Sequence, residues 1–240
     1  MRLLLFFSLD RSEMPLDNRR VILSLMKHAV SEYDREFFDV IYGIKEAKFY
    51  TFSLRWPKPQ FLKEKIVLSK PEFTMCFSSA DMKYSMVFYN AMLKQKNADY
   101  PLPGGNFCRL KKIVLLPERR IMSDSVNIKM LSPIVIRIHD REKYGNKDRY
   151  IDCTSENFPE QLKDTVEYQL RCMNIDESIA KDFSVKCIDA KKTVLFGYKR
   201  KINATIGILQ LRGNPLLLNF LYQAGIGSQR SLGMGNFEII

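Results

Sequence analysis

A glycine-rich stretch near the end of the sequence, residues 225–235 (GIGSQRSLGMG), places the tightest restriction on the fold. Four of the chain's 11 glycines lie in it, and glycine adopts positive backbone angles at little cost and lets another backbone approach closely. The stretch has no Lys-Ser or Lys-Thr ending, which excludes a P-loop. It runs into a strand pattern at residues 236–240, whereas a dinucleotide fingerprint opens a helix. Two interpretations remain: a loop that binds a phosphate chain, and a turn before the last strand.

The phosphate-binding interpretation uses both the backbone and the side chains of this stretch. A glycine-rich loop can turn its N–H groups inward as a nest for anions, and the central side chains add hydrogen-bond donors, one of them charged. The predicted RNA-binding residues of the loop are Gly225, Gly227, Ser228, Gln229, Arg230, Ser231, Gly233 and Gly235.

Hydrophobic periodicity predicts a repeated order of elements along the chain. The first half predicts a strand at 3–8, a helix at 18–34, a strand at 48–56, a strand region at 65–77 that is interrupted near Pro71, a helix at 82–96 and a strand at 107–116. The second half predicts a strand at 126–138 with a bend at residues 132–133, a loop at 139–150, a helix at 158–173, strands at 183–198 and 202–211, a helix at 215–224 and the final strand.

Both halves therefore have the order strand, helix, strand, strand, helix, strand, which is that of the ferredoxin-like unit. We predict an α+β protein of two tandem ferredoxin-like (βαββαβ) domains with a C-terminal glycine-rich loop. The predicted domains are residues 1–120, which carry the candidate catalytic histidine, and residues 121–240, with the boundary near 117–124.

The charge balance predicts a polyanionic partner. The formal net charge is +11 and the pI about 9.4, and residues 1–120 hold 21 Lys and Arg against 13 Asp and Glu. Two ferredoxin-like units side by side leave a groove, and basic hairpins along it would bind a nucleic acid backbone. Lys199, Arg200 and Lys201, at a predicted hairpin tip, are candidates for such contacts, although a solvated tip is the simpler interpretation.

The five cysteines indicate neither a zinc site nor a disulfide framework, because they are odd in number and none forms a C-x-x-C pair. They are typical of a reducing compartment. The apolar run after Arg2 is too short for a signal peptide, and no stretch is long enough to span a membrane. We therefore expect a cytoplasmic protein.

His28 is the candidate catalytic residue. Helical spacing places it beside the apolar stripe of the first predicted helix, where an imidazole can act as an acid or a base near neutral pH. A surface histidine without a role is the alternative. The candidate helpers are Tyr33, Tyr42 and Lys45, and for each of them the alternative is a structural or solvated side chain. The acidic residues and histidines show no metal-binding spacing, so we expect chemistry without a metal or other cofactor.

The second half of the chain also resembles a known family. Residues 207–215 (GILQLRGNP) and 221–235, together with 131–134 (LSPI) and the helix from Phe158, are similar to the CRISPR-associated repeat-processing endoribonucleases of the repeat-associated mysterious protein (RAMP) superfamily. The resemblance implies cleavage of CRISPR precursor RNA within its repeats, without metal, by attack of a ribose 2′-hydroxyl. The products carry a 5′-hydroxyl and a 2′,3′-cyclic phosphate or 3′-phosphate.

The resemblance also implies partners and an alternative function. Many members use a histidine on or just after the first helix, which corresponds to His28, whereas the helper residues vary. The expected partner is CRISPR repeat RNA, with other subunits of an interference complex as further candidates, and the protein is expected to be a monomer or homodimer. The alternative is a non-catalytic RNA-binding subunit that scaffolds a guide-RNA complex; the presence of His28 favours the nuclease.

Overall fold

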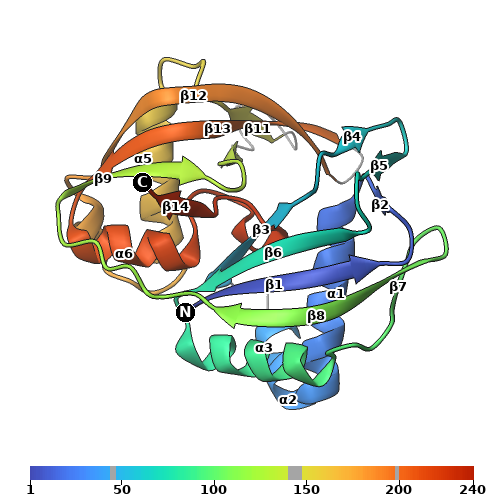
Figure 1. Ribbon diagram of the computed structural model, residues 1–240. Helices are drawn as coiled ribbons and strands as arrows, with labels where there is room; N and C mark the ends of the chain where they lie inside the picture. Colours follow the sequence, from blue (N-terminus) through green and yellow to red (C-terminus); the bar gives the residue numbers. More distant parts are fainter. Residues whose placement is uncertain (44–46, 140–147, 198–199) are drawn as a thin grey trace.

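The computed structural model describes residues 1–43, 47–139, 148–197 and 200–240, with only the backbone described at residues 196, 197 and 200 (Figure 1). Two antiparallel sheets, each with helices on one face, form most of the molecule. Within the part of the chain that is described, no helix is both long and apolar enough to cross a membrane.

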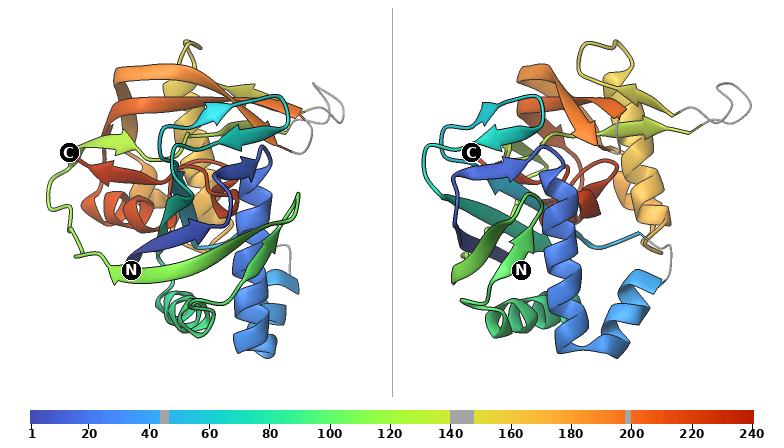
Figure 2. Two further views of the ribbon diagram at one scale, coloured as in Figure 1. Left: turned by 45° about the vertical axis from the view of Figure 1, so that its right-hand side comes forward. Right: turned by 90° about the vertical axis from the view of Figure 1, so that its right-hand side faces the viewer.

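The first half forms a five-stranded sheet in the order β3-β6-β1-β8-β7. Its strands are β1 (Arg2–Leu9), β3 (Tyr50–Arg55), β6 (Glu72–Ser79), β7 (Tyr100–Leu102) and β8 (Asn106–Leu115). Its helices are α1 (Asn18–Tyr33), α2 (Arg35–Gly43) and α3 (Met82–Lys94). Figures 1 and 2 show α1 and α3 on the same face of this sheet. If β7 at the edge is left out and the other four strands are numbered along the chain, their order across the sheet is second, third, first, fourth.

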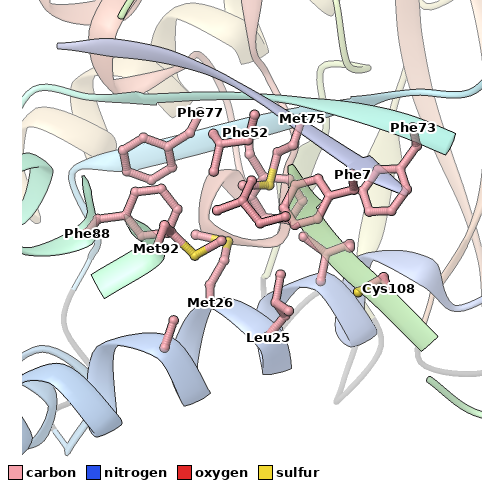
Figure 3. Packing of buried hydrophobic residues seen from close by; sticks show 14 of the residues in the cluster. Phe7, Leu25, Met26, Phe52, Phe73, Met75, Phe77, Phe88, Met92 and Cys108 are labelled. Carbon is pink, nitrogen blue, oxygen red and sulfur yellow. The ribbon is translucent and has the colours of Figure 1, made fainter. Parts of the chain in front are cut away.

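The core of this half lies between the sheet and these helices (Figure 3). Alternate residues of β1 point inward, and Leu3, Leu5 and Phe7 are buried, as the two-residue period of a strand requires. The Phe77 ring of β6 stacks on Phe88 of α3, with 4.0 Å between ring centroids. Burying each such side chain stabilises the fold by about 1.5–3 kcal/mol.

The second half repeats the arrangement with a four-stranded sheet in the order β12-β13-β9-β14. Its strands are β9 (Ser125–Met130), β12 (Ser184–Gly197), β13 (Arg200–Arg212) and β14 (Phe237–Ile239). Its helices are α5 (Phe158–Arg171) and α6 (Pro215–Ala224), whose buried leucines meet the strands in a second core. The order is again second, third, first, fourth, so the predicted α+β class and the repeated ferredoxin-like order are confirmed.

Parts of the element prediction differ from the structure in detail. The sequence predicts neither a helix nor a strand between residues 34 and 48, but α2 forms there because Phe37, Phe38 and Ile41 recur at helical spacing and the Asp34 carboxylate accepts a hydrogen bond from the Phe37 N–H (2.9 Å). The strand expected at 126–138 is two strands, divided at the bend that the sequence predicts at residues 132–133. β9 ends before Pro133, which cannot donate to a ladder, and the chain continues in another sheet.

The remaining elements are short. β10 (Ile136–Ile138) pairs with β11 (Arg149–Ile151), which lies within the predicted loop. β2 (Glu13–Pro15), β5 (Lys65–Val67) and β4 (Gln60–Phe61) form a small three-stranded sheet. Two short 3₁₀ helices are η1 (Glu177–Ala180) and η2 (Arg230–Leu232), the latter inside the glycine-rich stretch.

Candidate nucleic-acid interface

The glycine-rich loop packs against the first half of the chain and against its own second half, and all four of its glycines are buried. A Cβ added at Gly225 would lie 2.8 Å from the Thr51 side chain of β3, and one at Gly227 would lie 2.7 Å from the Val135 carbonyl oxygen. At Gly235 it would collide with the backbone of Ile226. These glycines are therefore required by close packing, with positive φ at each.

Side chains from the first half hold this region by its carbonyl groups. Thr51 Oγ1 donates to the Met234 carbonyl (2.6 Å), and Arg19 of α1 donates to the carbonyl of Gly233. Arg2, which is buried, donates to the carbonyls of Tyr222 (2.7 Å) and Phe237 (2.8 Å). Because these bonds use carbonyl oxygens of the second half, the loop and its flanking elements form a joint between the two halves.

Arg230 points into the interior of the second half. Its side chain is 9% exposed and donates to the Gly227 carbonyl (2.7 Å), with Met173 Sδ of the segment after α5 at 3.9 Å. Its Nε has no hydrogen-bond partner among the described residues. Burial lowers the pKa of Arg230 to about 10, so it stays protonated at neutral pH. This arrangement braces the loop, and an RNA contact by Arg230 remains a prediction.

The outer face of the loop is formed by Ser228, Gln229 and Ser231, which are half-buried. Ser228 Oγ accepts a hydrogen bond from the Arg137 N–H of β10 (3.3 Å). Of the predicted basic hairpin tip, Lys201 is exposed. Lys199 and the side chain of Arg200 lie outside the described residues. These positions remain predicted RNA contacts.

A cleft of about 790 Å³ lies between the two sheets. It is lined by residues of β1, β3 and β6 on one side and of β9 and β14 on the other, with Trp56, Arg55, Arg119 and Glu238 among the lining residues. Arg55 is exposed and Trp56 is half-buried against Phe73 (5.0 Å between ring centroids). A groove between the halves is expected from the sequence, and Arg119 belongs to one of the basic clusters in the sequence. Arg55 and Trp56 are not predicted to line the groove, although an arginine next to the chain's one tryptophan could have indicated it.

His28 lies on the exposed side of α1. Its ring is tilted against Tyr100 of β7, with 5.7 Å between ring centroids, and the Tyr100 hydroxyl donates to Ser24 Oγ (3.0 Å). His28 therefore lies beside the apolar stripe of α1, as the sequence predicts. The ring is held against one aromatic neighbour and is open to solvent.

The predicted helpers do not gather around His28. Lys27, the preceding residue on α1, places its ammonium 4.8 Å from the ring centroid of Tyr42 on α2. The Tyr42 hydroxyl is hydrogen-bonded to those of Tyr84 (2.6 Å) and Tyr50 (3.3 Å), and burial raises its pKa. Consecutive helical residues point about 100° apart, so Tyr42 lies by Lys27 on another side of α1 from Tyr100.

The other two helpers are not brought to His28 either. Tyr33 is exposed at the end of α1, and Lys45 lies outside the described residues. Among the residues that the structure describes, no three His, Cys, Asp or Glu side chains lie close enough together to hold a metal ion. Lys27 is absent from the predicted site residues, and its only signal in the sequence is its position next to His28.

Solved structures share this fold over their whole length. One, described as a Cas6-related gene of Pyrococcus furiosus, matches with a TM-score of 0.86 at 18% identity, covering 100% of this chain and 98% of that one. A second, described as a RAMP protein binding different RNA substrates, has a TM-score of 0.84 at 18% identity, covering 100% and 99%. A third, described as CRISPR-associated protein Cas6, has a TM-score of 0.78 at 18% identity, covering 100% and 99%.

The comparison with curated proteins gives no significant match. The family model for the C-terminal part of CRISPR-associated protein Cas6 matches residues 116–239. This range contains the whole second ferredoxin-like unit and the glycine-rich loop, which are the residues that carry the resemblance seen in the sequence. The chain therefore belongs to the Cas6 family of CRISPR-associated RAMP-fold proteins.

Proposed function

We propose that the protein is a metal-independent endoribonuclease that cuts CRISPR precursor RNA within its repeats and so produces guide RNAs. Membership of the Cas6 family carries this proposal. A Cas6 structure described as a product complex aligns with the whole of this chain at a TM-score of 0.73 and 15% identity. The proposed partner is CRISPR repeat RNA.

The proposed reaction needs only groups that RNA and the protein supply. The ribose 2′-hydroxyl loses its proton and its oxygen forms a bond to the adjacent phosphorus, while the bond from phosphorus to the 5′-oxygen breaks. The leaving oxygen takes a proton and becomes a 5′-hydroxyl, and the upstream product ends in a 2′,3′-cyclic phosphate that water can open to a 3′-phosphate. The protein has to align these oxygens and move a proton.

His28 is the proposed acid–base group. It is exposed on α1 and lies against the Tyr100 ring, so the imidazole is both accessible and partly oriented. As a neutral ring it accepts the 2′-hydroxyl proton, and as an imidazolium it protonates the 5′-oxygen. Lys27 and Tyr42 form a second ionisable pair on another side of α1, which makes them the direct competitors of His28 for this role.

The cleft between the sheets is the proposed path of the RNA backbone. Arg55 and Arg119 on its rim match a polyanion, in a chain whose net charge is +11. The loop residues Ser228, Gln229 and Ser231 are proposed to contact RNA on the outer face of the joint.

The competing function is a non-catalytic RNA-binding subunit. Two observations favour it: the predicted catalytic helpers do not converge on His28, and a structure of the same fold is described only as binding different RNA substrates. Such a scaffold would bind repeat RNA without cutting it.

Single-turnover cleavage of a repeat-containing RNA in the presence of EDTA tests the proposal. We expect one cut per repeat, a 5′-hydroxyl on the downstream product, and complete loss of the cut when the scissile ribose is 2′-deoxy while binding is retained. Binding without any cut would favour the scaffold. A cut that survives the deoxy substitution would contradict 2′-hydroxyl attack, and a cut lost in EDTA would contradict metal independence.

A further inference from the structure

The short strand β4 exposes an aromatic side chain that neither lines the cleft nor contacts the glycine-rich loop. Phe61 of β4 is 65% exposed, and Leu62 beside it is 44% exposed. Phe61 lies opposite Ile66 in the ladder, and Ile66 is fully buried. Because β4 is a two-residue strand at the edge of its sheet, the Phe61 ring is left open to solvent.

The surroundings of Phe61 are basic. Residues 55–70 contain five cations, Arg55, Lys58, Lys63, Lys65 and Lys70, and one acid, Glu64. Lys65 is paired with Glu13 of β2 (2.6 Å), while Lys58, Lys63 and Lys70 are exposed. An open aromatic ring among lysines is the composition with which proteins bind single-stranded nucleic acids, since bases stack on the ring and phosphates meet the cations.

The segment is also held in place and joined to the cleft. Trp56 lines the cleft. The Ser69 N–H donates to the Pro57 carbonyl (3.1 Å) and ties the two ends of this segment together, and the Leu62 N–H donates to the Lys65 carbonyl (2.9 Å) and closes the turn between β4 and β5. Phe61 is five positions after Trp56, a reach of at most about 18 Å. Figure 1 shows β4 and β5 beyond the end of β3, at one end of the molecule.

We propose that Phe61 is a stacking platform for an unpaired base of an RNA strand that leaves the cleft past Arg55 and Trp56, with Lys58 and Lys63 contacting the flanking phosphates. This rests on the proposed function in one respect, that RNA occupies the cleft. The platform contributes affinity for bases of any sequence, because every base has a π-face.

The test measures binding of two single-stranded probes, each about 15 nucleotides long, by fluorescence anisotropy. One is oligoadenylate and the other is a ribose-phosphate chain of equal length that lacks bases. Phe61→Ala should bind oligoadenylate about tenfold more weakly than the wild type and the abasic chain equally well, while Phe61→Trp should keep the wild-type affinity for both. Leu216→Ala, which removes an exposed apolar side chain on α6, is the matched control and should change neither.

A second measurement reports stacking directly. Trp56→Phe combined with Phe61→Trp leaves one tryptophan, at position 61, because the chain has only Trp56. Its fluorescence should be quenched by oligoadenylate and not by the abasic chain.

The outcomes separate this inference from the proposed function. Wild-type protein that binds neither probe nor the repeat-containing RNA of the cleavage assay would contradict RNA binding in the cleft. Wild-type protein that binds only the repeat RNA would overturn a platform for bases of any sequence. Normal wild-type binding with no change in Phe61→Ala and no quenching at position 61 would overturn the platform alone. So would a Phe61→Ala protein whose only change is weaker self-association, which would make the exposed edge of β4 a protein contact.

Discussion

The glycine-rich loop and the cleft both present arginines, but the two regions use them differently. Arg230 in the loop is buried and gives a hydrogen bond to the loop's own backbone, whereas Arg55 on the cleft rim is exposed. A buried cation with an internal partner stabilises the fold, and an exposed cation in a concave surface is available to a phosphate. An arginine in the sequence therefore does not show whether its region is a joint or a binding surface. The burial of the arginine side chain in the structure does.

The same contrast extends to the candidate catalytic residues. His28 is exposed, so its loss should affect chemistry and leave folding intact. The loop glycines are enclosed, so their loss should affect folding first. Paired variants of the two regions separate an effect on chemistry from an effect on folding.

The largest effect is expected for His28→Ala. A positioned acid–base group contributes about 10²–10⁴-fold to rate, so single-turnover cleavage should fall by that order, while RNA affinity and the free energy of unfolding change little. Tyr42→Phe is the companion variant. If it abolishes cleavage and His28→Ala cuts at the wild-type rate, the acid–base group lies in the Lys27–Tyr42 cluster instead.

Gly235→Ala should be the most destabilising alanine substitution among the loop glycines. The added Cβ meets the Ile226 backbone and the residue has φ of 70°, so we expect a loss of about 3 kcal/mol in the free energy of unfolding, measured by denaturant titration. Gly104→Ala is the matched control, because φ is 81° there with nothing within 4 Å of the added atom. Gly104→Ala should reduce the free energy of unfolding by only about 1–2 kcal/mol. Equal reductions for the two variants would contradict the claim that close packing requires a glycine at position 235.

Arg230→Ala should reduce the free energy of unfolding by about 2 kcal/mol, because it leaves the buried Gly227 carbonyl without this donor. Arg55→Ala should change stability by no more than about 0.5 kcal/mol. A stable Arg230→Ala protein with greatly weakened RNA binding would reverse this assignment and make Arg230 a phosphate ligand.

The smallest effect is expected in the salt dependence of binding. Each phosphate contact on a single strand contributes about −0.7 to the slope of log affinity against log salt. Replacing Arg55 and Arg119 together should make the slope less steep by about 1.4, measured by anisotropy at several salt concentrations. An unchanged slope would remove the cleft rim from the path of the RNA backbone.

Local patterns were enough to predict most of the fold. The helices at 18–34 and 82–96 are α1 (Asn18–Tyr33) and α3 (Met82–Lys94), because apolar residues at helical spacing need only one core face to pack against. The position of His28 beside the apolar stripe also followed from that spacing. The hydrogen bonds of Tyr42 with Tyr50 and Tyr84 could not be predicted from spacing, because they form only where α2 meets β3 and α3.

The sequence by itself determined the repeated order of elements, the core face of each one and the positive charge, since these depend on residue type and short-range spacing. Only the tertiary structure decided that the glycine-rich loop is an enclosed joint and that Arg55 and Arg119 border an open cleft. The physical reason is distance along the chain: Arg2 reaches the Tyr222 carbonyl across 220 residues, and no local pattern encodes which surfaces such contacts bury.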